Sequence, residues 1–169
     1  MEGRGIAATG IDVSPGAVVV SRDRGCSDVR EGDVLVADDS VLPQAAFQTV
    51  ILFGNNVGIG GTIEGAAKLL ERLMLATKPA GRLLVTGLDI ADTSSPHPLI
   101  YHARNRDRGR PIGEIRMRFE YEGSVGDWLP WFHPEPTELN QLAKGARWAL
   151  DRCIPVNGPF YGAVFEKPL

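Results

Sequence analysis

The sequence predicts an α/β fold, a doubly wound and mostly parallel sheet that ends in an antiparallel hairpin. Short apolar runs alternate with amphipathic segments through the first half of the chain, as they do in consecutive βα units. Segment 114–122 alternates apolar and polar residues, which is typical of a half-exposed antiparallel strand. Segments 148–156 and 160–166 flank the turn Asn157-Gly158-Pro159, so we expect them to pair as a hairpin.

Four strands and two helices are expected in the first half. Ser14 can cap a helix over 15–24, and Pro15 lies at its first position, where the missing N–H costs nothing. Thr62 is expected to cap a second helix that extends to about residue 77, with leucines at helical spacing. The strands are expected at 6–11, 28–30, 47–53 and 82–86, with a loop over 54–61 and a turn over 78–81.

The second half changes character, and we expect an antiparallel region inserted at about 89–133. Segment 89–98 is polar and contains proline, so it is predicted to be a loop. Thr137 is predicted to cap a helix that extends to about Gly145. No internal repeat or linker marks a second domain, and the chain is therefore predicted to form a single domain over residues 1–169.

The composition excludes several classes of protein. A net charge of −3 argues against nucleic acid as a general partner. Cys26 and Cys153 are too few for a disulfide framework, and no cluster has metal-ligand spacing, so no metal site is expected. The longest apolar runs are only long enough for strands, so no membrane segment is expected. A reducing, cytoplasmic location is the prediction.

Asp12 closes the first predicted strand and immediately precedes the first predicted helix. In nucleotide-binding α/β folds, an acid in this position binds the hydroxyl groups of a ribose. The other explanation is an ordinary acid near a helix N-terminus. Asp12 by itself does not separate one nucleotide cofactor from another.

Four segments, in this order and at this spacing, resemble the class I S-adenosylmethionine-dependent methyltransferases. The resemblance implies a Rossmann-like sheet that ends in an antiparallel hairpin, and it begins at the second strand of that family. The four segments are Ala8-Thr9-Gly10-Ile11-Asp12-Val13-Ser14-Pro15, Glu31-Gly32-Asp33-Val34, Phe47-Gln48-Thr49-Val50-Ile51-Leu52-Phe53 and Lys78-Pro79-Ala80-Gly81-Arg82-Leu83-Leu84.

The resemblance implies a role for six residues in binding S-adenosylmethionine. Asp12 would accept hydrogen bonds from both ribose hydroxyls, because a carboxylate has two acceptor oxygens. Val13 would pack on the adenine face, Asp33 would accept from the adenine amino group, and the N–H of Val34 would donate to a ring nitrogen. Gly54 and Asn55 would lie near the methionine end of the cofactor.

The first strand and glycine-rich loop of that family have no counterpart ahead of Asp12. A truncated reading frame is the expectation that we favour, and a degenerate remnant or a gap filled by another chain are the alternatives. The missing strand is central in the family's sheet. An exposed strand edge there would favour self-association, for example as a homodimer.

Candidate residues for the acceptor follow the predicted strands and the inserted region. Asn56 lies beside Asn55 at the carboxyl edge of the third strand, where open α/β sheets bind ligands, although asparagines also form ordinary turns. Tyr101, His102 and Arg104 belong to a basic segment that continues through Arg106, Arg108 and Arg110. This segment could bind an anionic or carboxylate-bearing acceptor, but a solvated basic loop is the simpler explanation.

Two further features of the inserted region have alternative explanations. His97 and His102 could act as general bases, although methyl transfer needs mainly the positioning of donor and acceptor. Trp128, Trp131, Phe132 and His133 could cover a small-molecule pocket or pack the insertion onto the core.

The function predicted from the sequence is S-adenosylmethionine-dependent methyl transfer to a small-molecule acceptor. No catalytic residue can be assigned. A non-catalytic binding or scaffold remnant of a methyltransferase is the first alternative, and a nicotinamide-dependent oxidoreductase is the second. The C-terminal hairpin and Asp33 favour the methyltransferase.

Overall fold

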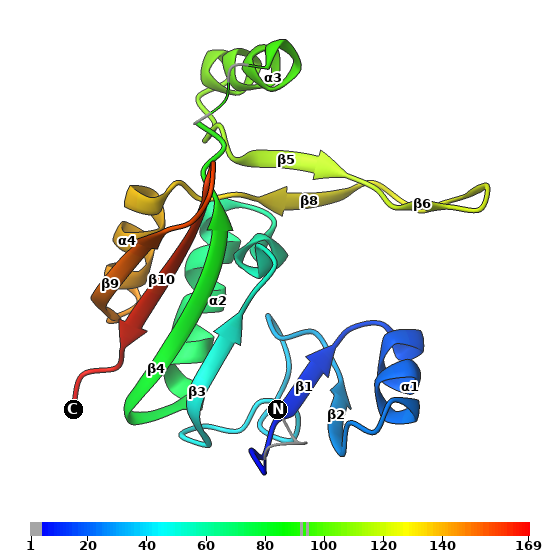
Figure 1. The fold of residues 1–169 in the computed structure, drawn as a ribbon, viewed down its shortest axis with the longest axis vertical. Helices are drawn as coiled ribbons and strands as arrows, with labels where there is room; N and C mark the ends of the chain where they lie inside the picture. Colours follow the sequence, from blue (N-terminus) through cyan, green and yellow to red (C-terminus); the bar gives the residue numbers. More distant parts are fainter. Residues whose placement is uncertain (1–4, 92, 94) are drawn as a thin grey trace. The chain divides into compact units, whose positions relative to one another are not determined.

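The computed structural model describes residues 5–91, 93 and 95–169 (Figure 1). The chain divides into two compact units, Met1–Gln44 and Ala45–Leu169, which are described one at a time. The single domain over residues 1–169 stays a prediction. None of the described helices is long and apolar enough to cross a membrane.

The first unit is a parallel βαβ element. Strand β1 (Thr9–Asp12) pairs in parallel with β2 (Asp28–Glu31), and helix α1 (Pro15–Asp23) connects them. The Ser14 hydroxyl accepts a hydrogen bond from the Ala17 N–H at 3.3 Å, which confirms the predicted cap, and Pro15 opens the helix. Because the strands are parallel and Asp12 is opposite Glu31, their carboxyl ends lie side by side.

The second unit contains a four-stranded mixed sheet in the order β3-β4-β10-β9. Strands β3 (Phe47–Leu52) and β4 (Thr77–Leu88) are parallel, whereas β10 (Phe160–Glu166) is antiparallel to both β4 and β9 (Ala149–Pro155). The predicted C-terminal hairpin is therefore confirmed. The predicted turn over 78–81 is wrong: β4 continues through it, with Ala80 at φ 55° and a shift in the β3–β4 register.

Helices α2 (Ile63–Ala76) and α4 (Pro136–Gly145) cover the same face of this sheet (Figure 1). Leu83 and Phe165 point from β4 and β10 into this layer and are fully buried. Thr62 caps α2 as predicted, by accepting from the Gly65 N–H. Thr137 is not the cap of α4: the cap is Glu135, two residues earlier, and the Glu138 carboxylate accepts from the Glu135 N–H.

The inserted region contains more regular structure than expected. Helix α3 (Pro96–Asp107) replaces the end of the predicted loop 89–98 and the predicted basic loop, and a short 3-10 helix, η2 (Asn56–Gly60), lies within the predicted loop 54–61. The predicted strand 114–122 is two strands, β5 (Glu114–Met117) and β6 (Glu120–Tyr121). They pair with β8 (Leu129–Phe132) and β7 (Ser124–Val125) in a long antiparallel ribbon (Figure 1).

We expect the buried face of α2 to carry much of the stability of the second unit. Leu70→Ala should lower the free energy of unfolding by about 2–5 kcal/mol, because Leu70 is fully buried and its loss leaves a cavity. Leu75 lies on the same helix and is 59% exposed, so Leu75→Ala should change the free energy of unfolding by less than about 0.5 kcal/mol. Urea unfolding measures both; equal effects would contradict the packing described.

Candidate functional site

The carboxyl edge of β1 and β2 carries the residues predicted to bind a nucleotide. Asp12 is the last residue of β1, and its Oδ1 accepts a hydrogen bond from the Ser14 N–H at 2.8 Å. The Asp12 carbonyl oxygen accepts from the Gly32 N–H at 3.0 Å, which ties the segment after β2 to the end of β1. Asp12 thus supports the start of α1, and its carboxylate has a second acceptor oxygen.

Asp33 follows β2 at the same edge of the first unit. Its Oδ1 accepts from the Leu35 N–H at 2.9 Å, and its carbonyl oxygen accepts from the N–H groups of Val36 and Ala37. Asp33 therefore begins a tight turn, and Val34 lies within that turn. Val13 directly follows Asp12 and is 70% exposed, so it presents an apolar side chain at this edge.

Gly54, Asn55 and Asn56 follow β3 in the second unit. Gly54 has φ 71°, and its N–H donates to the Thr86 hydroxyl at 2.9 Å. Apart from Gly54 and its two chain neighbours, no atom of the described residues lies within 4 Å of the position that a Gly54 Cβ would occupy, so there is open space beside the backbone there. Asn55 has φ 64°, a conformation that asparagine tolerates, and its carbonyl oxygen accepts from the Gly58 N–H.

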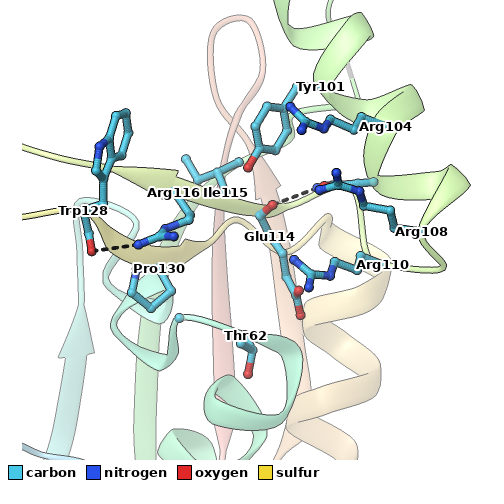
Figure 2. A pocket seen from close by; sticks show the side chains of 12 residues that line it. Thr62, Tyr101, Arg104, Arg108, Arg110, Glu114, Ile115, Arg116, Trp128 and Pro130 are labelled. Carbon is cyan, nitrogen blue, oxygen red and sulfur yellow. Dashed lines mark hydrogen bonds between the residues drawn. The ribbon is translucent and has the colours of Figure 1, made fainter.

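A pocket of about 490 Å³ lies within the second unit, between α3, the β5–β8 ribbon and the start of α2. Gly61 and Thr62 form its wall at the start of α2 (Figure 2). From α3 and the residues that follow it come Tyr101, Arg104, Asn105, Arg108 and Arg110. The ribbon contributes Glu114, Ile115, Arg116, Trp128 and Pro130.

Asn105 attaches α3 to the ribbon. Its side-chain amide donates to the carbonyl oxygens of Pro111 at 3.1 Å and Glu114 at 2.7 Å, and the side chain is almost completely buried. A buried amide with satisfied hydrogen bonds holds one geometry, because losing them would leave polar atoms unpaired. The C-terminal turn of α3 therefore has a defined position against β5.

The pocket has an excess of positive charge. Arg104, Arg108 and Arg110 extend from the α3 side toward β5, and Arg116 donates to the Trp128 carbonyl oxygen at 3.3 Å (Figure 2). Within the part of the chain that is described, none of these four arginines forms an ion pair. Glu114 is the one carboxylate in the lining, and its Oε1 accepts from the Ile63 N–H at 3.1 Å, at the start of α2.

The four residues predicted for the acceptor lie in different places. Tyr101 and Arg104 line the pocket, whereas Asn56 opens η2 and His102 does not line it. His102 is 4% exposed; burial lowers the pKa of its imidazole, nearby Arg106 adds to this effect, and Glu135 opposes it. His97 is exposed.

Several pocket residues were missed as candidates, among them Asn105, Glu114 and Arg116. One available signal was the pair Ser95-Pro96, which marks the start of α3 in the same way as Ser14-Pro15 marks α1. On a helix, Tyr101, Arg104, Asn105 and Arg108 fall on one face at spacings of three and four residues. No sequence signal indicates which strand this face meets.

The aromatic residues after β7 have mixed roles. Phe132 is fully buried, Trp131 packs against Gly58, and Trp128 lines the pocket with 53% exposure. The Nδ1 atom of His133 is buried and has no hydrogen-bond partner among the residues that the structure describes, and burial lowers the pKa of this imidazole. Among the described residues, no cluster of histidine, cysteine or acidic side chains could hold a metal ion.

Solved structures with a similar fold include two described as S-adenosylmethionine-dependent methyltransferases and one described as a methyltransferase. One from Bacteroides fragilis, in complex with S-adenosyl-L-homocysteine, has a TM-score of 0.77 and 22% identity; the match covers 99% of this chain and 66% of that one. One from Methanosarcina mazei has a TM-score of 0.72 and 13% identity, covering 95% and 82%. The CcbJ methyltransferase from Streptomyces caelestis has a TM-score of 0.69 and 13% identity, covering 99% and 77%.

These likenesses define the fold of the chain as that of the class I S-adenosylmethionine-dependent methyltransferases, a mixed α/β, Rossmann-like fold. The chain spans slightly less than two thirds of the Bacteroides fragilis protein. No protein-family model and no curated protein sequence matches the chain.

Two histidines, buried His102 and half-buried His133, make stability depend on pH. Because the pKa of each is lowered in the folded state, the unfolded chain binds protons first as the pH falls through the ordinary value of 6.5. The free energy of unfolding should therefore be highest above about pH 6.5 and decrease between there and pH 5.

Urea unfolding at several pH values, with single histidine variants, tests this dependence. His133→Gln should flatten the decrease, because the variant has no imidazole to protonate at that position. His97→Gln removes an exposed histidine and should leave the decrease in the free energy of unfolding with falling pH unchanged. Identical pH profiles for wild type and His133→Gln would show that burial of His133 does not shift its titration.

Proposed function

We propose that this chain serves S-adenosylmethionine-dependent methyl transfer to a small-molecule acceptor. The observation that supports the proposal most directly is the position of the two acids at the carboxyl edge of two parallel strands, in a chain with the methyltransferase fold: Asp12 ends β1, and Asp33 follows the end of β2 by two residues. Ligands of open α/β sheets bind at this end of the strands.

The residues of the first unit fit the adenosine part of S-adenosylmethionine. Only one Asp12 oxygen is needed to hold the Ser14 N–H, and the carboxylate can accept from the ribose hydroxyls as well. Val13 offers an exposed apolar surface to the adenine ring, and Asp33 offers an acceptor to its amino group. We assign the Val34 backbone N–H as the donor of a hydrogen bond to a nitrogen of the adenine ring.

The residues of the second unit that we assign to the cofactor are Gly54 and Asn55. The open backbone at Gly54 allows a ligand to approach closely, which a side chain would prevent. S-adenosylmethionine held by these residues would supply a methyl group on a sulfonium, and the electron pair of the C–S bond would return to sulfur when the acceptor took that methyl group. This chain's own contribution is then to position the acceptor and exclude water.

Asp12→Asn tests the assignment at the ribose. The amide oxygen can still accept from the Ser14 N–H, but the variant loses the charge and the second acceptor. We expect the affinity for S-adenosyl-L-homocysteine to fall by about tenfold or more, since a hydrogen bond to a charged group contributes about 1.5–3 kcal/mol. NMR titration of the full chain measures the affinity even when the dissociation constant is millimolar.

The matched control is Asp39→Asn, an exposed acid of the same unit outside the β1–β2 edge, which should leave the affinity unchanged. Equal affinities for wild type and Asp12→Asn would remove Asp12 from the site. No binding at millimolar concentration would favour the non-catalytic remnant, and preferential binding of NADH would favour a nicotinamide-dependent oxidoreductase.

A further inference from the structure

We propose that the pocket between α3 and the β5–β8 ribbon binds the methyl acceptor as a small aromatic acid, through an oxyanion that is a carboxylate or a phosphate. The inference rests on the proposed function, because it names the substrate class of the same reaction. Four properties of the pocket support it independently: the charge of its lining, the fixed position of its arginines, its apolar surface, and its place in the chain next to the residues assigned to the cofactor.

The charge of the lining selects an anion. Arg104, Arg108, Arg110 and Arg116 line the pocket, and within the described ranges none of them forms an ion pair. The chain as a whole has a net charge of −3, so the sign of the charge in this pocket is opposite to that of the whole protein. Guanidinium groups match carboxylate and phosphate oxygens with paired, nearly parallel hydrogen bonds.

The one carboxylate in the lining does not reduce this preference for an anion. Glu114 accepts from the Ile63 N–H at the first turn of α2, where the helix dipole stabilises a negative charge. Glu114 therefore already occupies the helix N-terminus that an external anion could have used. The arginines remain as the groups available for an incoming oxyanion.

The position of the arginines is defined by the fold rather than by a flexible loop. Arg104 lies in the last turn of α3, and Arg108, which caps the C-terminus of the helix, follows it by four positions. Asn105 lies between them and holds this turn to the start of β5 through three carbonyl oxygens. A scattered basic surface would need no such attachment, and a preorganised site loses less entropy when it binds.

The remaining lining suits an aromatic body. Tyr101, Ile115, Trp128 and Pro130 contribute apolar surface, and the volume of about 490 Å³ is within the usual range for small-molecule sites. The Arg118 guanidinium lies 4.9 Å from the centre of the Trp128 ring, which holds this ring in place from one side.

The position of the pocket in the chain connects it with the assigned cofactor residues. Gly61 and Thr62, which form one wall, end the same loop that begins with Gly54 and Asn55. Trp131 packs against Gly58 in the middle of this loop, so the loop and the ribbon are held together. An oxyanion paired with arginines is a weak nucleophile; the arginines are therefore positioning residues, and another atom of the acceptor takes the methyl group.

Calorimetry of the full chain with benzoate, phenyl phosphate and benzamide tests the inference. We expect at least one of the two anions to bind, and uncharged benzamide to bind at least tenfold more weakly. The tighter anion identifies the group as carboxylate or phosphate. Arg108→Gln should weaken anion binding tenfold or more, and Arg108→Lys should weaken it less, because lysine keeps the charge but loses the planar donor pair.

Arg106→Gln is the matched control, since Arg106 lies on α3 between Arg104 and Arg108 but does not line the pocket. It should change anion affinity by less than twofold. Equal losses for Arg106→Gln and Arg108→Gln, equal binding of benzamide, or the absence of anion binding would each overturn the inference.

Titration of the same proteins with S-adenosyl-L-homocysteine separates the inference from the proposed function. Arg108→Gln should bind it as wild type does. Binding of S-adenosyl-L-homocysteine without any anion binding rejects the inference and keeps the function. Arginine-dependent anion binding without S-adenosyl-L-homocysteine binding rejects the proposed function, and with it the assignment of the anion as a methyl acceptor.

Discussion

Helix α2 is packed along its apolar face and bound to opposite charges at its two ends, and the second unit depends on this arrangement. Its side chains Leu69, Leu70 and Leu73 are buried, and the Trp148 indole N–H donates to the Leu70 carbonyl oxygen in the middle of the helix. Glu114 accepts at its N-terminus, whereas the Lys167 ammonium donates to the carbonyl oxygens of Met74 and Thr77 at its C-terminal end. Both charges complement the helix dipole.

The contact between Glu114 and α2 also contributes to the excess of positive charge in the pocket. It joins the inserted ribbon to the sheet-covering helix, and it uses the one acidic side chain of the lining for a structural purpose. The arginines that line the pocket, from α3, the residues after it and β5, form no ion pair within the described part of the chain. The same hydrogen bond therefore serves the stability of the fold and the selectivity that we propose for the site.

Prediction from sequence succeeded where the deciding interaction is local. The caps at Ser14 and Thr62 depend on residues three positions apart, and the C-terminal hairpin depends on a turn between adjacent strands. It failed at α3, where the arginines suggested a basic loop although Ser95-Pro96 carries the signal for a helix start. It also failed at 78–81, which lie within β4 as an irregularity between two paired positions, since Thr77 and Arg82 on either side pair with β3.

The sequence by itself determined the α/β class, the order of the main strands and the acids at the ends of β1 and β2, since periodicity and strand-end position are properties of neighbouring residues. Only the tertiary structure decided which arginines share a pocket and that Glu114 faces α2. Those outcomes depend on contacts such as that between Ile63 and Glu114, 51 positions apart, and packing rather than local preference selects such contacts.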